Sequence, residues 1–276
     1  MSFCDNCVKG VIHEGTPKGK WEKLGGVDCY VAAPTIDYPK DKAVLFMADI
    51  FGAQLVNAQV CNGLDVILLS GLPTLTLYLQ TMIMKLMADA FAENGFFTVI
   101  PDYLNGDPIP LDGLDPGSGF DIGKWLLNHG ADQTRPPLDK VINALKVQGV
   151  TGFGATGYCF GGRYVFDLAF ENVINVGVVA HPSLLQVPAD LEKYFATSRA
   201  PLLINSCPVD SVFPPEGQAK ADEIFGGGKF APGYKRNFYE GCTHGFAVRG
   251  DLNDPNVKVG KEAAFRETVE WFIKYL

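Results

Sequence analysis

The chain has 276 residues, of which 47% are hydrophobic and 12% aromatic, and this is enough apolar material for one large globular domain. Lys and Arg number 23 against 31 Asp and Glu, so the formal net charge is −8, and the basic residues are scattered rather than clustered. Such a charge distribution disfavours nucleic acid and anionic membrane surfaces as partners. We therefore expect a single domain over residues 1–276 that binds neither.

Cysteine usage and the N-terminal stretch together predict a cytoplasmic protein. The stretch MSFCDNCVKG lacks the basic segment and apolar run of a secretory signal. The cysteines are odd in number and spread along the chain, a pattern typical of reduced thiols. They are Cys4, Cys7, Cys29, Cys61, Cys159, Cys207 and Cys242.

Cys4 and Cys7 form a CxxC pair, which in some proteins binds a metal or carries out thiol redox chemistry. No second CxxC and no CxxxH partner accompanies this pair, and no thioredoxin-like βαβ pattern follows it. We therefore favour an N-terminal segment without chemistry, with metal or redox chemistry as the alternative.

Short apolar runs alternate with helical patterns along the chain. Strands are predicted at 27–33, 43–48, 96–100, 151–157, 175–180, 201–205 and 235–239. Helices are predicted at about 86–94, 120–129, 137–147, 162–171, 216–225 and 258–275. Continuous apolar strands are typical of a parallel sheet covered on both faces. The alternation predicts an α/β fold in three layers with a mostly parallel central sheet.

A cysteine flanked by glycines lies between a predicted strand and a predicted helix, in the sequence Gly157-Tyr158-Cys159-Phe160-Gly161. This fits the nucleophile-elbow pattern GxSxG, with cysteine in the place of serine. The elbow is so sharp that side chains at the two flanking positions would collide, and glycine removes that clash. The start of a helix also favours thiolate over thiol. Cys159 is therefore a candidate nucleophile.

The partners of such a nucleophile follow in the order found in α/β-hydrolases, acid before base. Asp210 comes after the predicted strand 201–205, and His244 comes after the predicted strand 235–239. A histidine at a strand end can take and return a proton near neutral pH, and an aspartate can fix its tautomer.

The other histidines fit the role of base less well than His244. His13 lies in the N-terminal segment, His129 ends a predicted helix, and His181 follows a strand without a Gly-rich turn.

The stretches GYCFGGR, PVDSVFPPE, CTHGFAVRGD, MADIFG and FFTVIPDY resemble the dienelactone hydrolase family. The resemblance spans about residues 25–276, and the opening CDNCVKGVIHEGTPKG is similar to the fungal branch. It implies a three-layer α/β-hydrolase fold with Cys159 as nucleophile, Asp210 as acid and His244 as base. Asp49 matches a position where many relatives carry a glutamate that helps to activate the thiol.

These parts imply hydrolysis of a small ester or lactone through an acyl-enzyme on Cys159, with the backbone N–H groups of Ile50 and Phe160 holding the oxyanion. No metal and no organic cofactor is expected. The partner is a small molecule, and the protein is expected to be a monomer or a small homo-oligomer. The alternative function is a non-catalytic or redox-responsive binding protein that retains the hydrolase fold and uses Cys159 as a reactive thiol.

Bacterial members of the family are expected to bind a substrate carboxylate with two arginines. This chain has no arginine before Arg135, so the first of them is missing. Arg249 is the candidate for the second, and a solvated surface charge is the alternative interpretation. The sequence therefore does not support strict dienelactone specificity.

Residues 60–85 form an apolar insertion where relatives carry a short connection. The stretch is too short and too interrupted, by Gly71 and Pro73, to predict a membrane span. It could be a lid, a buried extra helix or a translated intron retained in the gene. We favour the intron, because Val codons begin with GT, codons for Gln80 or Lys85 can end in AG, and the flanks join in frame.

Overall fold

The computed structural model describes residues 8–53 and 73–276, with the backbone alone over 73–81 and at 111. The described residues form an eight-stranded sheet in the order β1-β2-β4-β3-β5-β6-β7-β8. The strands are β1 (Lys20–Leu24), β2 (Val27–Ala32), β3 (Lys42–Met47), β4 (Thr98–Pro101), β5 (Gly152–Tyr158), β6 (Val176–Ala180), β7 (Leu202–Ser206) and β8 (Tyr234–Phe238). Only the β1–β2 and β2–β4 pairs are antiparallel. The mostly parallel sheet predicted from the sequence is confirmed.

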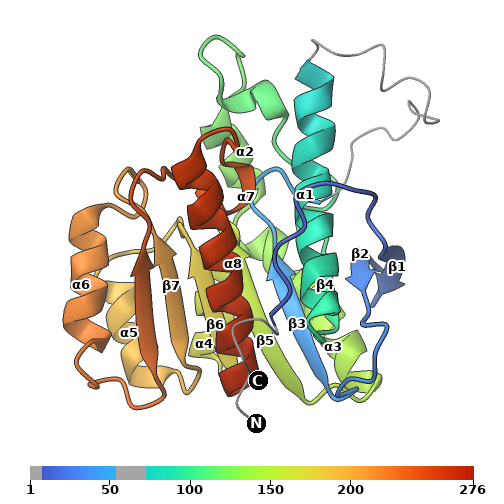
Figure 1. The fold of residues 1–276 in the computed structure, drawn as a ribbon, viewed down its shortest axis with the longest axis vertical. Coiled ribbons are helices and arrows are strands. Elements are labelled where there is room, and N and C mark those ends of the chain that lie inside the picture. Colours follow the sequence, from blue (N-terminus) through green and yellow to red (C-terminus); the bar gives the residue numbers. More distant parts are fainter. Residues whose placement is uncertain (1–7, 54–72) are drawn as a thin grey trace.

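Helices cover both faces of this sheet (Figure 1). One face carries α1 (Pro73–Glu93), α7 (Phe246–Arg249) and α8 (Pro255–Tyr275). The other carries α3 (Ala131–Val147), α4 (Gly161–Phe170), α5 (Ala189–Thr197) and α6 (Pro215–Phe225). A 3₁₀ turn, η2 (Leu111–Leu114), and α2 (Ile122–Asn128) follow β4. No helix among the described residues is long and apolar enough to cross a membrane.

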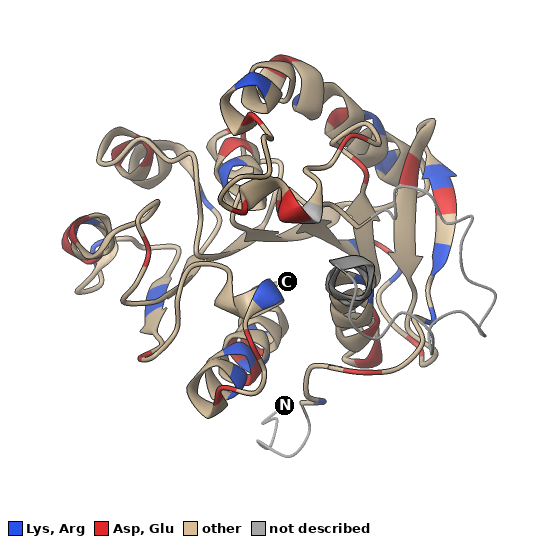
Figure 2. Ribbon diagram, turned by 90° about the horizontal axis from the view of Figure 1, so that it is seen from above, with Lys and Arg blue, Asp and Glu red and all other residues tan. Residues whose placement is uncertain are grey.

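The two helical layers are held by side chains that alternate along the strands. In β3, Val44 and Phe46 pack under α1 and α8, whereas Leu45 and Met47 pack on the opposite side. Seen from above, acidic and basic residues lie interspersed on the outer elements, and the sheet between them carries few charges (Figure 2). The charged residues therefore coat a sheet that is buried on both faces.

The elements that could not be predicted from the sequence are short or bury few side chains. β1 has the sequence KWEKL, in which Leu24 alone is buried, so it reads as a polar segment. α5 and α7 are short, with 9 and 4 residues. α3 begins at Ala131, ahead of the prolines Pro136 and Pro137 that set the predicted start at 137.

The first helix begins much earlier than predicted. The pattern predicts a helix at about 86–94, whereas α1 starts at Pro73 and therefore includes the end of the 60–85 stretch. Met84 is fully buried, in the layer that also contains Phe91. The boundary prediction was wrong because the apolar stretch before residue 86 continues the helix. Residues 60–72 lie outside the described residues, so the intron and lid interpretations stay predictions.

The turn from β5 into α4 has the tight geometry expected of a nucleophile elbow. Cys159 has φ +51°, a left-handed conformation that is strained for a residue with a side chain. A Cβ at Gly157 would lie 2.5 Å from the carbonyl oxygen of Gly161. A Cβ at Gly161 would overlap the carbonyl oxygen of Met47 on the neighbouring β3. The steric reason for both glycines, predicted from the sequence, is confirmed.

Replacing Met84 with alanine should test whether the first half of α1 belongs to the core. Removing a fully buried methionine should lower the free energy of unfolding by about 2–5 kcal/mol. The matched control is Leu127→Ala, which removes an apolar side chain that is 80% exposed and should cost under about 0.5 kcal/mol. Urea denaturation of both variants provides the measurement, and equal small losses would show that α1 contributes no packing at Met84.

Gly161→Ala should cost about 1–3 kcal/mol or more of stability, because its Cβ meets backbone that cannot move without separating β3 from α4. Gly10→Ala is the control, since a Cβ there has nothing within 4 Å and Gly10 has no left-handed φ. Thermal unfolding followed by circular dichroism would compare the two variants. A Gly161→Ala protein as stable as Gly10→Ala would contradict the close approach.

Candidate active site

Five neighbouring parallel strands place polar side chains at one edge of the sheet. Asp49 follows β3, Cys159 follows β5, His181 follows β6, Asp210 follows β7 and His244 follows β8. Because the carboxyl ends of parallel strands share an edge, residues far apart in the chain meet there. This is the upper edge in Figure 1, opposite the edge at which the C-terminus is marked.

Cys159 is fixed by backbone hydrogen bonds to the loop after β6. Its N–H donates to the carbonyl oxygen of Ala180 at 3.2 Å, and its own carbonyl oxygen accepts the N–H of Ser183 at 2.9 Å. The Cys159 Sγ lies 3.7 Å from the Ser183 Oγ. Cys159 is 7% exposed and lies two residues before the start of α4.

His244 and Asp210 form the hydrogen bond that their strand positions predicted. The Nδ1 of His244 lies 2.9 Å from the Oδ1 of Asp210, and the His244 N–H donates to the carbonyl oxygen of Val209 at 2.9 Å. Asp210 Oδ1 also accepts the N–H groups of Val212 and Phe213, each at 2.9 Å. The carboxylate is therefore held in place before it orients the imidazole.

Charge favours a protonated imidazole in this Cys–His–Asp cluster (Cys159, His244 and Asp210). Burial by itself would lower the pKa of His244. The hydrogen bond to Asp210, together with the negative charges of Asp210 and Cys159, outweighs burial and raises that pKa to about 9. An imidazolium next to the thiol stabilises the thiolate, the form that acts as a nucleophile.

The remaining described cysteines lack this environment. Burial raises the pKa of the Cys29 and Cys207 thiols to about 12, and that of Cys242 is raised for the same reason. All four described cysteines are free and buried. Among the described cysteines, Cys159 differs from the other three because its charge acts on a histidine, His244. The Cys4 and Cys7 pair and Cys61 lie outside the described residues.

Asp49 and Arg249 form a second charged pair beside the cluster. Asp49 is fully buried, and its Oδ1 accepts the N–H of Phe51 at 3.0 Å. The Arg249 Nε lies 2.6 Å from Asp49 Oδ2, close enough for an ion pair although the N–H is not aligned for a hydrogen bond. The guanidinium also lies over the Phe51 ring, 4.8 Å from its centroid. Burial raises the pKa of Asp49, and the charge of Arg249 opposes that rise.

Arg249 is ion-paired and largely buried in this structure. Its side chain is 16% exposed, less than is typical of a solvated surface charge. The guanidinium of Arg249 is engaged in the ion pair with Asp49. Among the described residues, no hydrogen bond joins Asp49 to the Cys159 thiol, the contact that the family resemblance suggested.

The two backbone groups expected at the oxyanion site are Ile50 and Phe160. Ile50 follows Asp49, and Phe160 follows Cys159 at the start of α4. Neither N–H donates to another group within the part of the chain that the structure describes. Two unpaired donors next to a nucleophile are the feature that an oxyanion requires.

Sequence reasoning missed the loop His181-Pro182-Ser183 after β6. Ser183 contacts the Cys159 thiol, and the His181 ring lies 4.9 Å from the His244 ring between centroids. The signal that could have found it is topological, because β6 pairs with β5 and its carboxyl end must lie beside the elbow.

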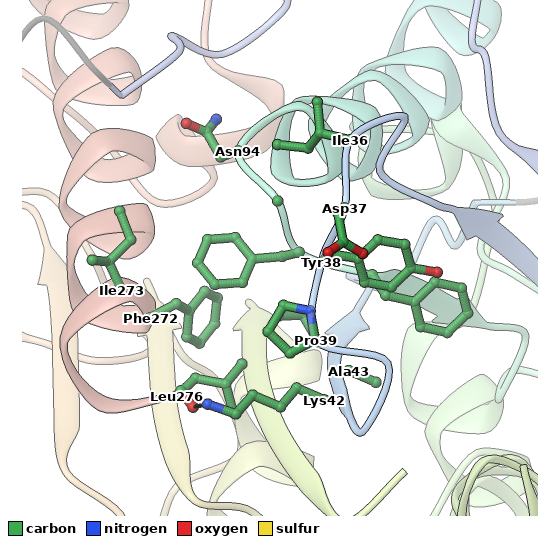
Figure 3. Close-up of a pocket in the computed structure, with 14 residues that line it drawn as sticks. Ile36, Asp37, Tyr38, Pro39, Lys42, Ala43, Asn94, Phe272, Ile273 and Leu276 are labelled. Carbon is green, nitrogen blue, oxygen red and sulfur yellow. Dashed lines mark hydrogen bonds between the residues drawn. The ribbon is translucent and has the colours of Figure 1, made fainter. Parts of the chain in front are cut away.

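A separate cavity of about 380 Å³ lies at the other end of β3 (Figure 3). Tyr38, Phe272 and Leu276 are among its lining residues, and Lys42 donates to the carbonyl oxygen of Leu276 beside it. The Tyr38 ring stacks on Phe97 with 6.1 Å between centroids. This cavity carries no cysteine or histidine among its lining residues, so it lacks the chemistry of the Cys–His–Asp cluster.

Comparisons with known proteins identify the family of the chain. A model of the Dienelactone hydrolase family matches residues 79–276. The hydrolase pyvD of Aspergillus violaceofuscus is 34% identical over 275 residues, covering 98% of this chain and 96% of that protein. Dienlactone hydrolase 1 of Gibberella moniliformis is 28% identical over 271 residues, covering 96% of this chain and 91% of that protein.

Solved structures agree on the fold. A putative dienelactone hydrolase from Klebsiella pneumoniae has a TM-score of 0.59 at 17% identity, covering 94% of this chain and 97% of that one. The sequence match spans more than half of the chain and extends over the strands and loops that carry Cys159, Asp210 and His244. The chain belongs to the dienelactone hydrolase family, as its motifs indicated.

Proposed function

We propose that the protein hydrolyses small, uncharged esters or lactones through an acyl-enzyme on Cys159. Membership of the family makes it a hydrolase of ester or lactone bonds. The observation that carries the finer proposal is the Cys–His–Asp cluster, in which a buried aspartate orients a histidine whose pKa is raised beside the elbow cysteine.

Acylation begins with the thiolate of Cys159 attacking the carbonyl carbon, so that an S–C bond forms and the carbonyl oxygen becomes an oxyanion. We assign donation to that oxygen to the N–H groups of Ile50 and Phe160, which the described residues leave without an acceptor. The C–O bond to the leaving group then breaks, and the leaving oxygen takes the proton of the His244 imidazolium. In a lactone this oxygen stays attached to the acyl chain.

Deacylation uses the neutral imidazole left by the first half-reaction. Water attacks the thioester carbonyl while His244 takes one of its protons, and the C–S bond breaks to return the thiolate. Asp210 stabilises the imidazolium that re-forms, through the 2.9 Å contact to Nδ1. The acid is released and the ion pair of thiolate and imidazolium is restored.

Asp49 supports this cycle through its charge. A fully buried carboxyl group favours its neutral form unless a cation lies beside it. Arg249 supplies that cation at 2.6 Å, and we assign its role to this pair rather than to a substrate carboxylate. An ionised Asp49 in turn favours protonated His244, the form that accompanies the thiolate.

The distribution of cations supports an uncharged substrate. The undescribed stretches contain no Lys or Arg, so every cationic side chain of the protein is placed by the structure. Arg249, the cation beside the cluster, already faces Asp49, and Arg163 in α4 faces Asp167 and Asp190. A substrate carboxylate in the site would therefore lose its hydration without gaining a free partner, which is costly.

Turnover of aryl esters tests the nucleophile. Cys159→Ala should lower kcat/KM for a short-chain 4-nitrophenyl ester by about 10³-fold or more, because the acyl-enzyme cannot form. The matched control is Cys29→Ala, which removes another buried free thiol and should stay within about threefold of the wild type. Mass spectrometry of the wild-type protein after rapid quenching should find the acyl group on Cys159. Absence of turnover on esters and lactones alike would favour the redox-responsive binding protein instead.

Substrate charge can be varied at nearly constant shape. The wild type should hydrolyse 4-nitrophenyl hexanoate with a kcat/KM about tenfold or more above that of the mono-4-nitrophenyl ester of adipate, since the terminal carboxylate has no free cation. Rates are corrected for spontaneous hydrolysis. A preference for the adipate ester that disappears in Arg249→Gln would instead assign the arginine to the substrate.

A further inference from the structure

His181 contacts the proposed base without belonging to the Cys–His–Asp cluster. Its ring packs edge to face on the His244 ring, with 4.9 Å between centroids and 62° between planes. The ring of Phe246 packs on it in the same way at 5.5 Å, and Tyr158 lies tilted at 6.3 Å. His181 therefore stands behind His244, between the base and the apolar layer under α7 and α8.

The backbone holds this ring in place at some cost. His181 has φ +38°, in the left-handed region that few residues with a side chain adopt. Its N–H donates to the carbonyl oxygen of Asn205 at 2.9 Å, and the preceding Ala180 accepts the N–H of Cys159. Strained conformations of this kind persist where the surroundings enforce them, and they cluster at functional sites.

The His181 ring is neutral in this environment. It is fully buried, and neither ring nitrogen has a hydrogen-bond partner among the described residues. Burial lowers the pKa of His181 well below its usual value, and the positive charges of His244 and Arg249 lower it further. Only one of the two neighbouring imidazoles can therefore be protonated. The negative charges of Asp210 and Cys159 favour protonation of His244.

We propose that His181 is a positioning residue whose neutral ring holds the His244 imidazole in the plane that joins Asp210 to Cys159. The hydrogen bond to Asp210 fixes one atom of His244 but leaves the ring free to swing about that contact. The edge-to-face contact removes this freedom, and a neutral aromatic ring also interacts favourably with an imidazolium beside it. The inference rests on the proposed role of His244 as the base.

The positioning role of His181 can be tested without an ester substrate, because the reactivity of the Cys159 thiolate can be followed directly. The pH dependence of Cys159 alkylation by iodoacetamide reports on the thiolate, which His244, Arg249, Asp210 and Asp49 influence from the surrounding elements. Two variants distinguish the contribution of the aromatic ring of His181 from that of its polar nitrogen atoms. His181→Phe keeps an aromatic ring without nitrogens, and His181→Asn tolerates the left-handed backbone without a ring.

We expect the aromatic ring of His181, and not its nitrogen atoms, to determine the alkylation rate of Cys159 and kcat. His181→Asn should lower alkylation at neutral pH about tenfold, move its pH profile to higher pH, and lower kcat about tenfold with KM changed less than about threefold. His181→Phe should stay within about threefold of the wild type in each measurement. The control His13→Phe alters a histidine whose Nε2 contacts Glu262 of α8, and it should change nothing.

An asparagine variant with wild-type alkylation, or a phenylalanine variant as slow as asparagine, would overturn the proposal. If His181→Phe does not fold, the nitrogen NMR spectrum of the wild-type protein decides the matter. The proposal requires His181 to stay neutral across the range in which His244 is protonated, and a protonated His181 at neutral pH would contradict it. Absence of turnover on every ester with the alkylation pattern intact would refute the proposed function, while the finding that the His181 ring positions His244 beside the thiolate would stand.

Discussion

The close approach of α4 to β3 is the constraint on which the site depends. Gly161 lies against the carbonyl oxygen of Met47, so the helix that begins after Cys159 meets the sheet without an intervening side chain. This contact forces the turn that gives Cys159 its left-handed backbone and places the thiol above the sheet edge. The same edge carries Asp49, two residues after Met47, so one backbone contact positions both the nucleophile and the buried carboxylate.

Two groups of opposite charges lie at this edge of the sheet, the Cys–His–Asp cluster and the pair of Asp49 and Arg249. The Cys–His–Asp cluster carries one positive imidazolium between two acidic groups, and Arg249 balances the fully buried Asp49. Little water reaches these groups, so the attractions are stronger than they would be on the surface, and an unpaired member would be costly. This explains why Arg249, which could have bound a substrate carboxylate, instead forms an ion pair with Asp49.

The sequence predicts the parts of the fold and site that have local signatures. Continuous apolar strands and the flanking glycines predicted the sheet and the elbow, and chain order predicted that Asp210 would meet His244. The partner of Arg249 could not be predicted, because it depends on how α7 packs beside α1 and α8, which brings Arg249 to the loop after β3. β1 was missed because an edge strand with one buried residue has no apolar pattern.

His181 illustrates the limit of predicting a role from spacing alone. His181 follows its strand without the Gly-rich turn expected of a base that must reach the nucleophile. A residue that acts by contact needs only to follow the strand between the nucleophile and the acid, and β6 lies between β5 and β7. His129, which is also buried, stacks on Trp125 with 3.9 Å between centroids, and its Nδ1–H donates to the carbonyl oxygen of Trp125, as in a structural histidine. Among the described residues His181 has no such hydrogen-bond partner, and its ring packs on His244, so the ring rather than its hydrogen bonding is the property that the site uses.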